Sequence, residues 1–148
     1  MSLKQKLQKD LKEALRARDE RRKAVIRLTL AAIANAEIKH GGELDDAGVT
    51  AVLQQQARRR RDTIAELQQV NRSDLLAAEE AELVILEQYL PRLLSREEIA
   101  AEARQVIAEV EATGMGQVGP VMGQLMSKLK GRVDGRVVNE IVRELLSG

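Results

Sequence analysis

The chain of 148 residues contains no cysteine, no tryptophan and no phenylalanine, and it has one histidine and one tyrosine. Without cysteine there can be no disulfide, thiolate nucleophile, iron–sulfur cluster or cysteine-based zinc site. A single histidine argues against a histidine-rich metal centre. Modules that stack nucleic-acid bases need several exposed aromatic rings, so an aromatic content of 1% argues against that mode of recognition.

Long hydrophobic runs are also absent. No stretch approaches 18 uncharged apolar residues, so the sequence predicts no membrane-spanning segment. The first twenty residues are charged throughout and include four acids, unlike a secretory signal or a transit peptide. We therefore expect a cytoplasmic protein.

Apolar residues recur at helical spacing along almost the whole chain, and no stretch alternates with the period of two typical of strands. The sequence therefore predicts an all-α fold. A capping box, with Ser95 at the N-cap and Glu98 three residues later, indicates the start of one helix. The other expected N-caps are Ser2, Asp19 and Asp134.

Seven helices are expected, in two parts. Pro91 stops the fourth helix, which makes Pro91-Arg92 the best boundary. We predict a larger four-helix domain over residues 1–91 and a small three-helix domain over residues 92–148. Within the larger domain, Val25 to Ala36 is apolar nearly all round, as expected of a central buried helix. The first helix carries an apolar stripe of Leu3, Leu7, Leu11 and Leu15.

The net charge of +1 hides a strong segregation of charge. Residues 1–61 hold 15 Lys and Arg against 8 Asp and Glu, whereas residues 62–111 hold 4 against 12. Residues 112–148 hold 5 against 3. The chain is therefore basic at its start, acidic in its middle and mildly basic at its end.

Two basic runs stand out. Arg21-Arg22-Lys23 falls in the first turn of the second helix, where positive charge opposes the helix dipole. Either a bound anion or nearby acids would compensate it. Four consecutive arginines, Arg58 to Arg61, fan around their helix, so a solvated face or pairing with the acidic fourth helix is favoured over an RNA groove.

No motif in the chain supports catalysis by itself. Gly114 to Gly119 matches G-x-G-x-x-G, but a helix precedes it where a dinucleotide-binding unit needs a strand. An inter-helix turn is the favoured interpretation, and a phosphate on its backbone N–H groups is the alternative. His40 has no partners for nucleophilic chemistry. We expect no catalytic residue, no metal and no cofactor.

The segment Val121 to Val142 closely resembles the C-terminal signature of the YqeY-like family, also called the GatB/YqeY domain. Ala31 to Ile38 and Glu87 to Pro91 stand where that family has similar blocks. The resemblance covers essentially the whole chain. It implies an all-helical, two-part fold similar to the helical tail of the B subunit of the glutamyl/aspartyl-tRNA amidotransferase, where the tail binds tRNA.

The resemblance also implies candidate RNA-binding residues, of which the basic turn before the last helix is the best. Such side chains would contact the phosphate backbone without reading sequence. The amidotransferase tails commonly have Asn-Pro where this chain has Asp134-Gly135, as free-standing relatives do. The candidates are Lys128, Lys130, Arg132 and Arg136, together with Arg21 and Arg22 of the first basic run.

Three hypotheses about function remain open at this point. The preferred one is an accessory module that binds tRNA or another structured RNA and has no catalysis of its own. The second is a component of a carbon–nitrogen ligase with glutamine as amido-N-donor, acting on mischarged aminoacyl-tRNA beside amidotransferase or aminoacyl-tRNA synthetase proteins. The third is a protein-interaction adaptor that uses the acidic middle segment, with Glu79, Glu80 and Glu82 as its contacts.

Overall fold

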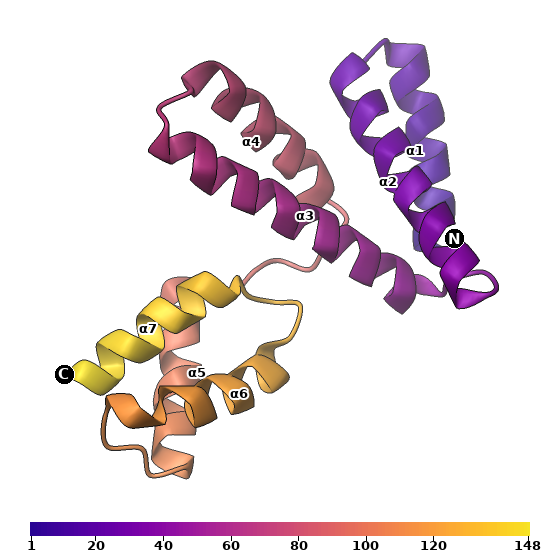
Figure 1. Ribbon diagram of the computed structural model, residues 1–148. Helices are drawn as coiled ribbons and strands as arrows, with labels where there is room; N and C mark the ends of the chain where they lie inside the picture. Colours follow the sequence, from indigo (N-terminus) through magenta and orange to yellow (C-terminus); the bar gives the residue numbers. More distant parts are fainter. The chain divides into compact units, whose positions relative to one another are not determined.

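A computed structural model describes residues 1–148 and confirms the all-α class, with seven α-helices and no strand (Figure 1). A single 3-10 turn, η1 (Met115–Gln117), precedes the sixth helix. The helices are α1 (Leu3–Ala17), α2 (Glu20–His40), α3 (Asp46–Gln69), α4 (Ser73–Glu87), α5 (Arg96–Glu109), α6 (Val118–Leu129) and α7 (Gly135–Ser147).

The chain divides into two compact units, Met1–Leu90 with α1 to α4 and Pro91–Gly148 with α5 to α7. The division lies after Leu90, one residue before the end of the domain expected from the sequence. None of the helices is long and apolar enough to cross a membrane.

The predicted N-caps are confirmed. Ser2 Oγ accepts a hydrogen bond from the Gln5 amide at 3.1 Å, and Asp19 Oδ1 accepts one from the Arg22 amide at 3.1 Å. Ser95 and Glu98 form the expected capping box. Asp134 caps α7 by accepting from the Arg136 amide at 3.0 Å. These bonds satisfy backbone donors that a helix start otherwise leaves unpaired.

The first unit is built around one apolar core to which all four helices contribute. Its buried residues are Leu7, Val25, Ile26, Ile33, Val49, Leu53, Ala57 and Leu86.

The sequence prediction of a helix buried all round is wrong for α2. Leu28 and Ile38 are 56% and 79% exposed, because the other helices cover one side of α2 and leave the opposite side uncovered. Leu15 of α1 is exposed too. Each step of four residues turns the leucine stripe by about 40°, so it leaves the core before its end, where Ala14 is buried instead.

The second unit has a separate core between α5, α6 and α7. Its buried residues are Ile99, Ala103, Val106, Val121, Leu125, Leu129, Val138, Ile141, Val142 and Leu146. Pro120 lies in the first turn of α6, where its missing N–H breaks no helical hydrogen bond. The turn from α6 to α7 carries the candidate RNA-binding residues Lys130 and Arg132, and it joins two helices of this packed three-helix core.

Candidate nucleic-acid interface

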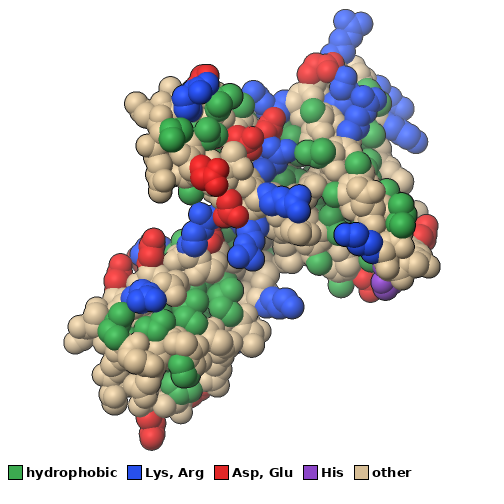
Figure 2. Space-filling view, viewed as in Figure 1, with side chains coloured by type: hydrophobic (Ala, Val, Ile, Leu, Met, Phe, Trp, Pro, Cys, Tyr) green, Lys and Arg blue, Asp and Glu red, His purple; other side chains and the backbone are tan.

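The turn between α1 and α2 concentrates unpaired positive charge. Arg18 adopts the left-handed conformation (φ 56°) and ends α1, while Asp19 caps α2, so only two residues join the helices. Arg16, Arg18 and Arg21 are all exposed and make no ion pair within 4 Å. Figure 2 shows Lys and Arg side chains gathered at this end of the α1–α2 hairpin. We name Arg16, Arg18 and Arg21 the α1–α2 turn surface.

Arg22, although it was predicted together with Arg21, lies in a different environment. Its Nη2 is 3.5 Å from Asp10 Oδ2, and its buried Nε has no hydrogen-bond partner. A hydrogen bond to Tyr89 and the nearby carboxylate of Asp10 raise the pKa of Arg22. Lys23 is also engaged, with Nζ 2.6 Å from Glu20 Oε2. Within the run, nearby acids compensate two of the three cations, and Arg21 alone stays available.

Sequence reasoning missed Arg16 and Arg18. The signal was present, since both residues directly precede the predicted cap at Asp19 and would lie at the same end of the hairpin as Arg21. It was overlooked because the two arginines are not consecutive with the run at 21–23.

In the second unit, the turn from α6 to α7 presents the other candidates. Gly131 takes a positive φ of 80°, and the Arg132 amide donates to the Leu129 carbonyl at 2.9 Å to close the turn. Lys130 and Arg132 are exposed and make no ion pair within 4 Å. Lys128 instead pairs with Glu102 at 2.7 Å. The turn thus offers two open cations rather than a row of four.

Arg136 lies beside this turn, with its Nε 3.8 Å from Asp134 Oδ1. The segment before α5 also reaches the turn, because the Leu94 amide donates to the Arg132 carbonyl at 2.8 Å. That segment brings in Arg92, an exposed cation that was not among the predicted residues and whose Nη2 lies 3.9 Å from Glu98 Oε1. We name Arg92, Lys130 and Arg132 the α6–α7 turn surface.

The pKa of Glu98 supports the grouping of Arg92 with Arg132. Hydrogen bonds with Ser95 lower the pKa of Glu98, and the positive charges of Arg92 and Arg132 lower it further. Both guanidinium groups therefore act on the same carboxylate. The α1–α2 turn surface and the α6–α7 turn surface lie in different units, so each has to be judged as a separate cationic site.

One known protein family matches nearly the whole chain. The family model described as "Yqey-like protein" matches residues 4–146. The chain belongs to the YqeY-like family. Both cationic turns lie inside the matched region.

The relatives are fungal proteins named "Altered inheritance of mitochondria protein 41, mitochondrial". The chain is 38% identical to that of Lachancea thermotolerans and 37% to that of Kluyveromyces lactis, each over 108 residues, 71% of this chain and 58% of the relative. It is 36% identical to that of Saccharomyces cerevisiae over 88 residues, 59% of this chain and 48% of the relative. The chain thus matches between 48% and 58% of these relatives' length.

These relatives overturn the expectation of a cytoplasmic location, since they are named as mitochondrial proteins. The expectation rested on the charge pattern of the N-terminal residues. That pattern reflects the formation and packing of helix α1. It says nothing of where the relatives reside.

In this YqeY-like protein two of the four consecutive arginines, Arg60 and Arg61, pair with acids of α4, whereas Arg58 and Arg59 are exposed. Arg60 Nη1 lies 3.2 Å from Glu79 Oε2 and 2.5 Å from Glu82 Oε2. Arg61 Nη2 lies 3.9 Å from Glu87 Oε2. The sequence favoured a solvated face or pairing with the acidic fourth helix over an RNA groove, and the structure has pairing for Arg60 and Arg61 and a solvated face for Arg58 and Arg59. The pairing also engages two of the three acids on which the adaptor hypothesis depends.

The glycine-rich turn forms no nucleotide site of the dinucleotide-binding kind, because helices flank it on both sides. The Gln117 side chain carbonyl accepts hydrogen bonds from the amides of Thr113 and Gly114. Those two backbone donors are already satisfied within the chain, so the structural interpretation of the turn is favoured over a phosphate cradle.

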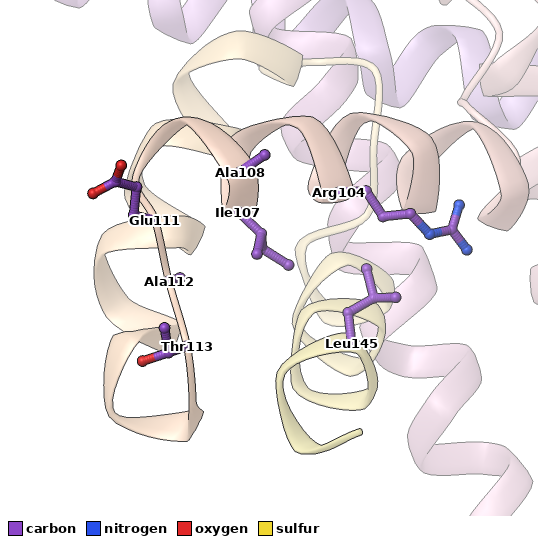
Figure 3. A pocket seen from close by; sticks show the side chains of 7 residues that line it. All are labelled: Arg104, Ile107, Ala108, Glu111, Ala112, Thr113 and Leu145. Atoms are coloured by element: carbon purple, nitrogen blue, oxygen red, sulfur yellow. The ribbon is translucent and has the colours of Figure 1, made fainter.

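An open cavity of about 440 Å³ lies on the second unit against α5 and the end of α7. Figure 3 shows that Arg104 and Glu111 extend from opposite ends of it, so they form no acid–base pair. Apolar side chains, among them Ile107 and Leu145, make up much of the lining. No group of three or more His, Asp or Glu residues is placed to hold a metal ion.

Proposed function

We propose that this YqeY-like protein is an accessory module that binds tRNA or another structured RNA through its cationic turns, without catalysis of its own. The observation that carries the proposal is the α1–α2 turn surface. Three arginines from two helix ends are exposed there, and none of them makes an ion pair within 4 Å. An anionic partner would supply the missing counter-charge.

The chemistry of these turns favours phosphate over bases. Tyr89 is the only aromatic residue, and it is engaged in the first unit, so no ring is available for stacking. Arginine offers several N–H donors in a planar fork that suits phosphate oxygens. Such contacts position an RNA backbone and leave recognition to its shape.

The α6–α7 turn surface offers a second contact of the same kind. Lys130 and Arg132 flank Gly131, whose left-handed conformation makes the turn tight. The resemblance to the tail of the amidotransferase favours RNA as the partner for this turn. Either turn alone would give weak binding, and a structured RNA that reaches both would bind more tightly through effective concentration.

The test is a titration of the full chain with tRNA at several salt concentrations. Each phosphate contact releases condensed counterions, so the apparent affinity should fall steeply as salt rises. The double variant Arg18→Gln with Arg21→Gln should weaken binding several-fold and lower the salt slope by about two. Lys130→Gln with Arg132→Gln should do the same for the second turn.

A matched control removes two exposed cations elsewhere. Arg59 of α3 and Arg104 of α5 are exposed and make no ion pair within 4 Å, so Arg59→Gln with Arg104→Gln makes the same change in net charge. If the control weakens binding as much as the turn variants, the RNA responds only to total charge and the proposal fails. A flat salt response, or no binding at low salt, would also reject it.

A further inference from the structure

The outer face of α2 is apolar and uncovered. Leu28 is 56% exposed and Ile38 is 79% exposed, and Ala24 and Ala31 are exposed on the same side of the helix. Steps of four, three and seven residues join these positions, so they form one stripe along the helix. The opposite side of α2 carries the core of the unit, so this helix is apolar on two sides.

Positive charge borders this stripe. Because each residue turns the helix by about 100°, Arg27 falls on one edge of the stripe and Lys39 on the other. Both are exposed and make no ion pair within 4 Å. The one acid near the face, Glu20, is paired with Lys23. We name Ala24, Leu28, Ala31 and Ile38, with Arg27 and Lys39 at the edges, the α2 outer face.

We propose that the α2 outer face docks an acidic amphipathic helix of a partner protein. Apolar anchors of the partner, spaced by three and four residues, would lie along the stripe, and Asp or Glu on both flanks would meet Arg27 and Lys39. The stripe from Ala24 to Ile38 spans about 21 Å, the length of four helical turns. Asn35 lies within it and offers a polar contact that would fix the register.

Charge decides against a second copy of the chain as the occupant. Two α2 outer faces packed together would add a second Arg27 and a second Lys39, and the one acid either copy has near the face, Glu20, is already paired with Lys23. The residue types decide against a membrane. Helices that lie in a lipid interface present several bulky apolar side chains, often aromatic, whereas this stripe has two bulky residues and two alanines.

This docking surface is separate from the proposed RNA contact. It shares no residue with the α1–α2 turn surface or the α6–α7 turn surface. It also differs from the acidic patch of the adaptor hypothesis, since it is cationic and lies on α2 rather than α4. The two proposals can therefore fail independently.

The experiment uses the full chain and a labelled synthetic helix of about 16 residues, long enough for four turns. The probe carries Leu at the helical spacing i, i+3, i+4 and i+7, so that the leucines form one stripe. Glu residues lie on both sides of this stripe. A twin probe has Lys in place of each Glu. Fluorescence anisotropy should show saturable binding of the Glu probe and none of the Lys probe.

Single substitutions test the location. Leu28→Asp should weaken binding of the Glu probe at least ~10-fold, since it places a charge at the centre of the stripe. Val84→Asp on α4 is the matched control, because Val84 is also 56% exposed but lies outside the face, and it should leave binding unchanged. Arg27→Glu should weaken the Glu probe and give binding to the Lys probe.

Several results would overturn the proposal. These are no binding of the Glu probe, equal binding of both probes, or equal effects of Leu28→Asp and Val84→Asp. Binding to anionic phospholipid vesicles that Leu28→Asp abolishes would assign the face to a membrane instead. A concentration-dependent dimer that Leu28→Asp disrupts would assign it to a second copy. Because each altered side chain is largely exposed, circular dichroism should show the fold of all variants unchanged.

Discussion

The hydroxyl of Tyr89 donates a hydrogen bond to the carboxylate of Asp10, 79 residues earlier in the chain. Asp10 is only 9% exposed, and Arg22 lies 3.5 Å from the same oxygen. The ammonium of Lys6 lies 5.5 Å from the centre of the Tyr89 ring. The one aromatic side chain of the protein thus fastens the end of the first unit to its two first helices.

Tyr89→Phe should destabilise the first unit by about 1–2 kcal/mol. It removes a hydrogen bond to a largely buried carboxylate and leaves Arg22 as the remaining partner of Asp10. Urea unfolding followed by circular dichroism would measure the change. An unaltered free energy of unfolding would contradict the structural role given to this contact.

The same residue predicts a loss of stability at high pH. Burial, followed by the hydrogen bond with Asp10, raises the pKa of Tyr89 to about 12. The ordinary value is about 10, so the folded state keeps a proton that the unfolded chain loses. Stability from this group is therefore complete below about pH 10 and is lost as the pH rises through about 12. The free energy of unfolding should fall more steeply in this range for the wild type than for Tyr89→Phe.

The helix starts could be predicted because they depend on local contacts. Ser2, Ser95 and Asp134 each bond a backbone amide within three residues, so the sequence contains the whole interaction. The buried face of α2 could not be predicted, because Leu28 and Ile33 are both large apolar residues and differ in whether a neighbouring helix covers them. That depends on packing between segments far apart in the chain.

The candidate site shows the same limit. Arg21 and Arg22 look equivalent in the sequence, yet Arg21 is open to solvent and Arg22 lies against Asp10 of the preceding helix. Antiparallel packing of α1 on α2 gives the two arginines different surroundings. A count of charges along the sequence cannot predict this difference. The same packing aligns Arg16 and Arg18 with Arg21 at the hairpin end.

Arg60→Met should destabilise the α3–α4 pair, whereas Arg59→Met should not. The Arg60 side chain is 14% exposed and holds Glu79 and Glu82 together. Without it, two neighbouring carboxylates would repel one another in a partly buried site. We expect a loss of about 1–3 kcal/mol, below that of a fully buried pair. Arg59 is exposed, so its variant is the matched control in thermal unfolding, and equal losses would refute the assignment.

Gly41→Ala should cost about 1 kcal/mol, while Gly42→Ala should be close to neutral. Gly41 ends α2 with φ 85°, a conformation in which a Cβ is strained. A Cβ would meet no atom within 4 Å at either glycine, so crowding cannot account for a difference between them. Denaturant midpoints of the two variants compare the backbone effect directly. Equal stability of the two would show that the helix end relaxes.

The capping box of α5 predicts a dependence on low pH. Glu98 Oε1 accepts from the Ser95 amide at 3.3 Å, and this bond is the main reason that the pKa of Glu98 is lowered. A lowered pKa means that the contribution is present above the ordinary value of about 4.3 and is lost as the pH falls through the folded value.

Glu98→Gln keeps a side-chain oxygen that can accept from Ser95 but removes the titration. The wild type should therefore lose more stability than Glu98→Gln between about pH 5 and pH 3. Glu97→Gln, which changes an exposed acid in the same turn, should follow the wild type. Thermal unfolding across this pH range separates the two variants. Parallel curves for all three proteins would mean that Glu98 titrates alike in the folded and unfolded chain, and the capping bond would then contribute nothing that depends on its charge.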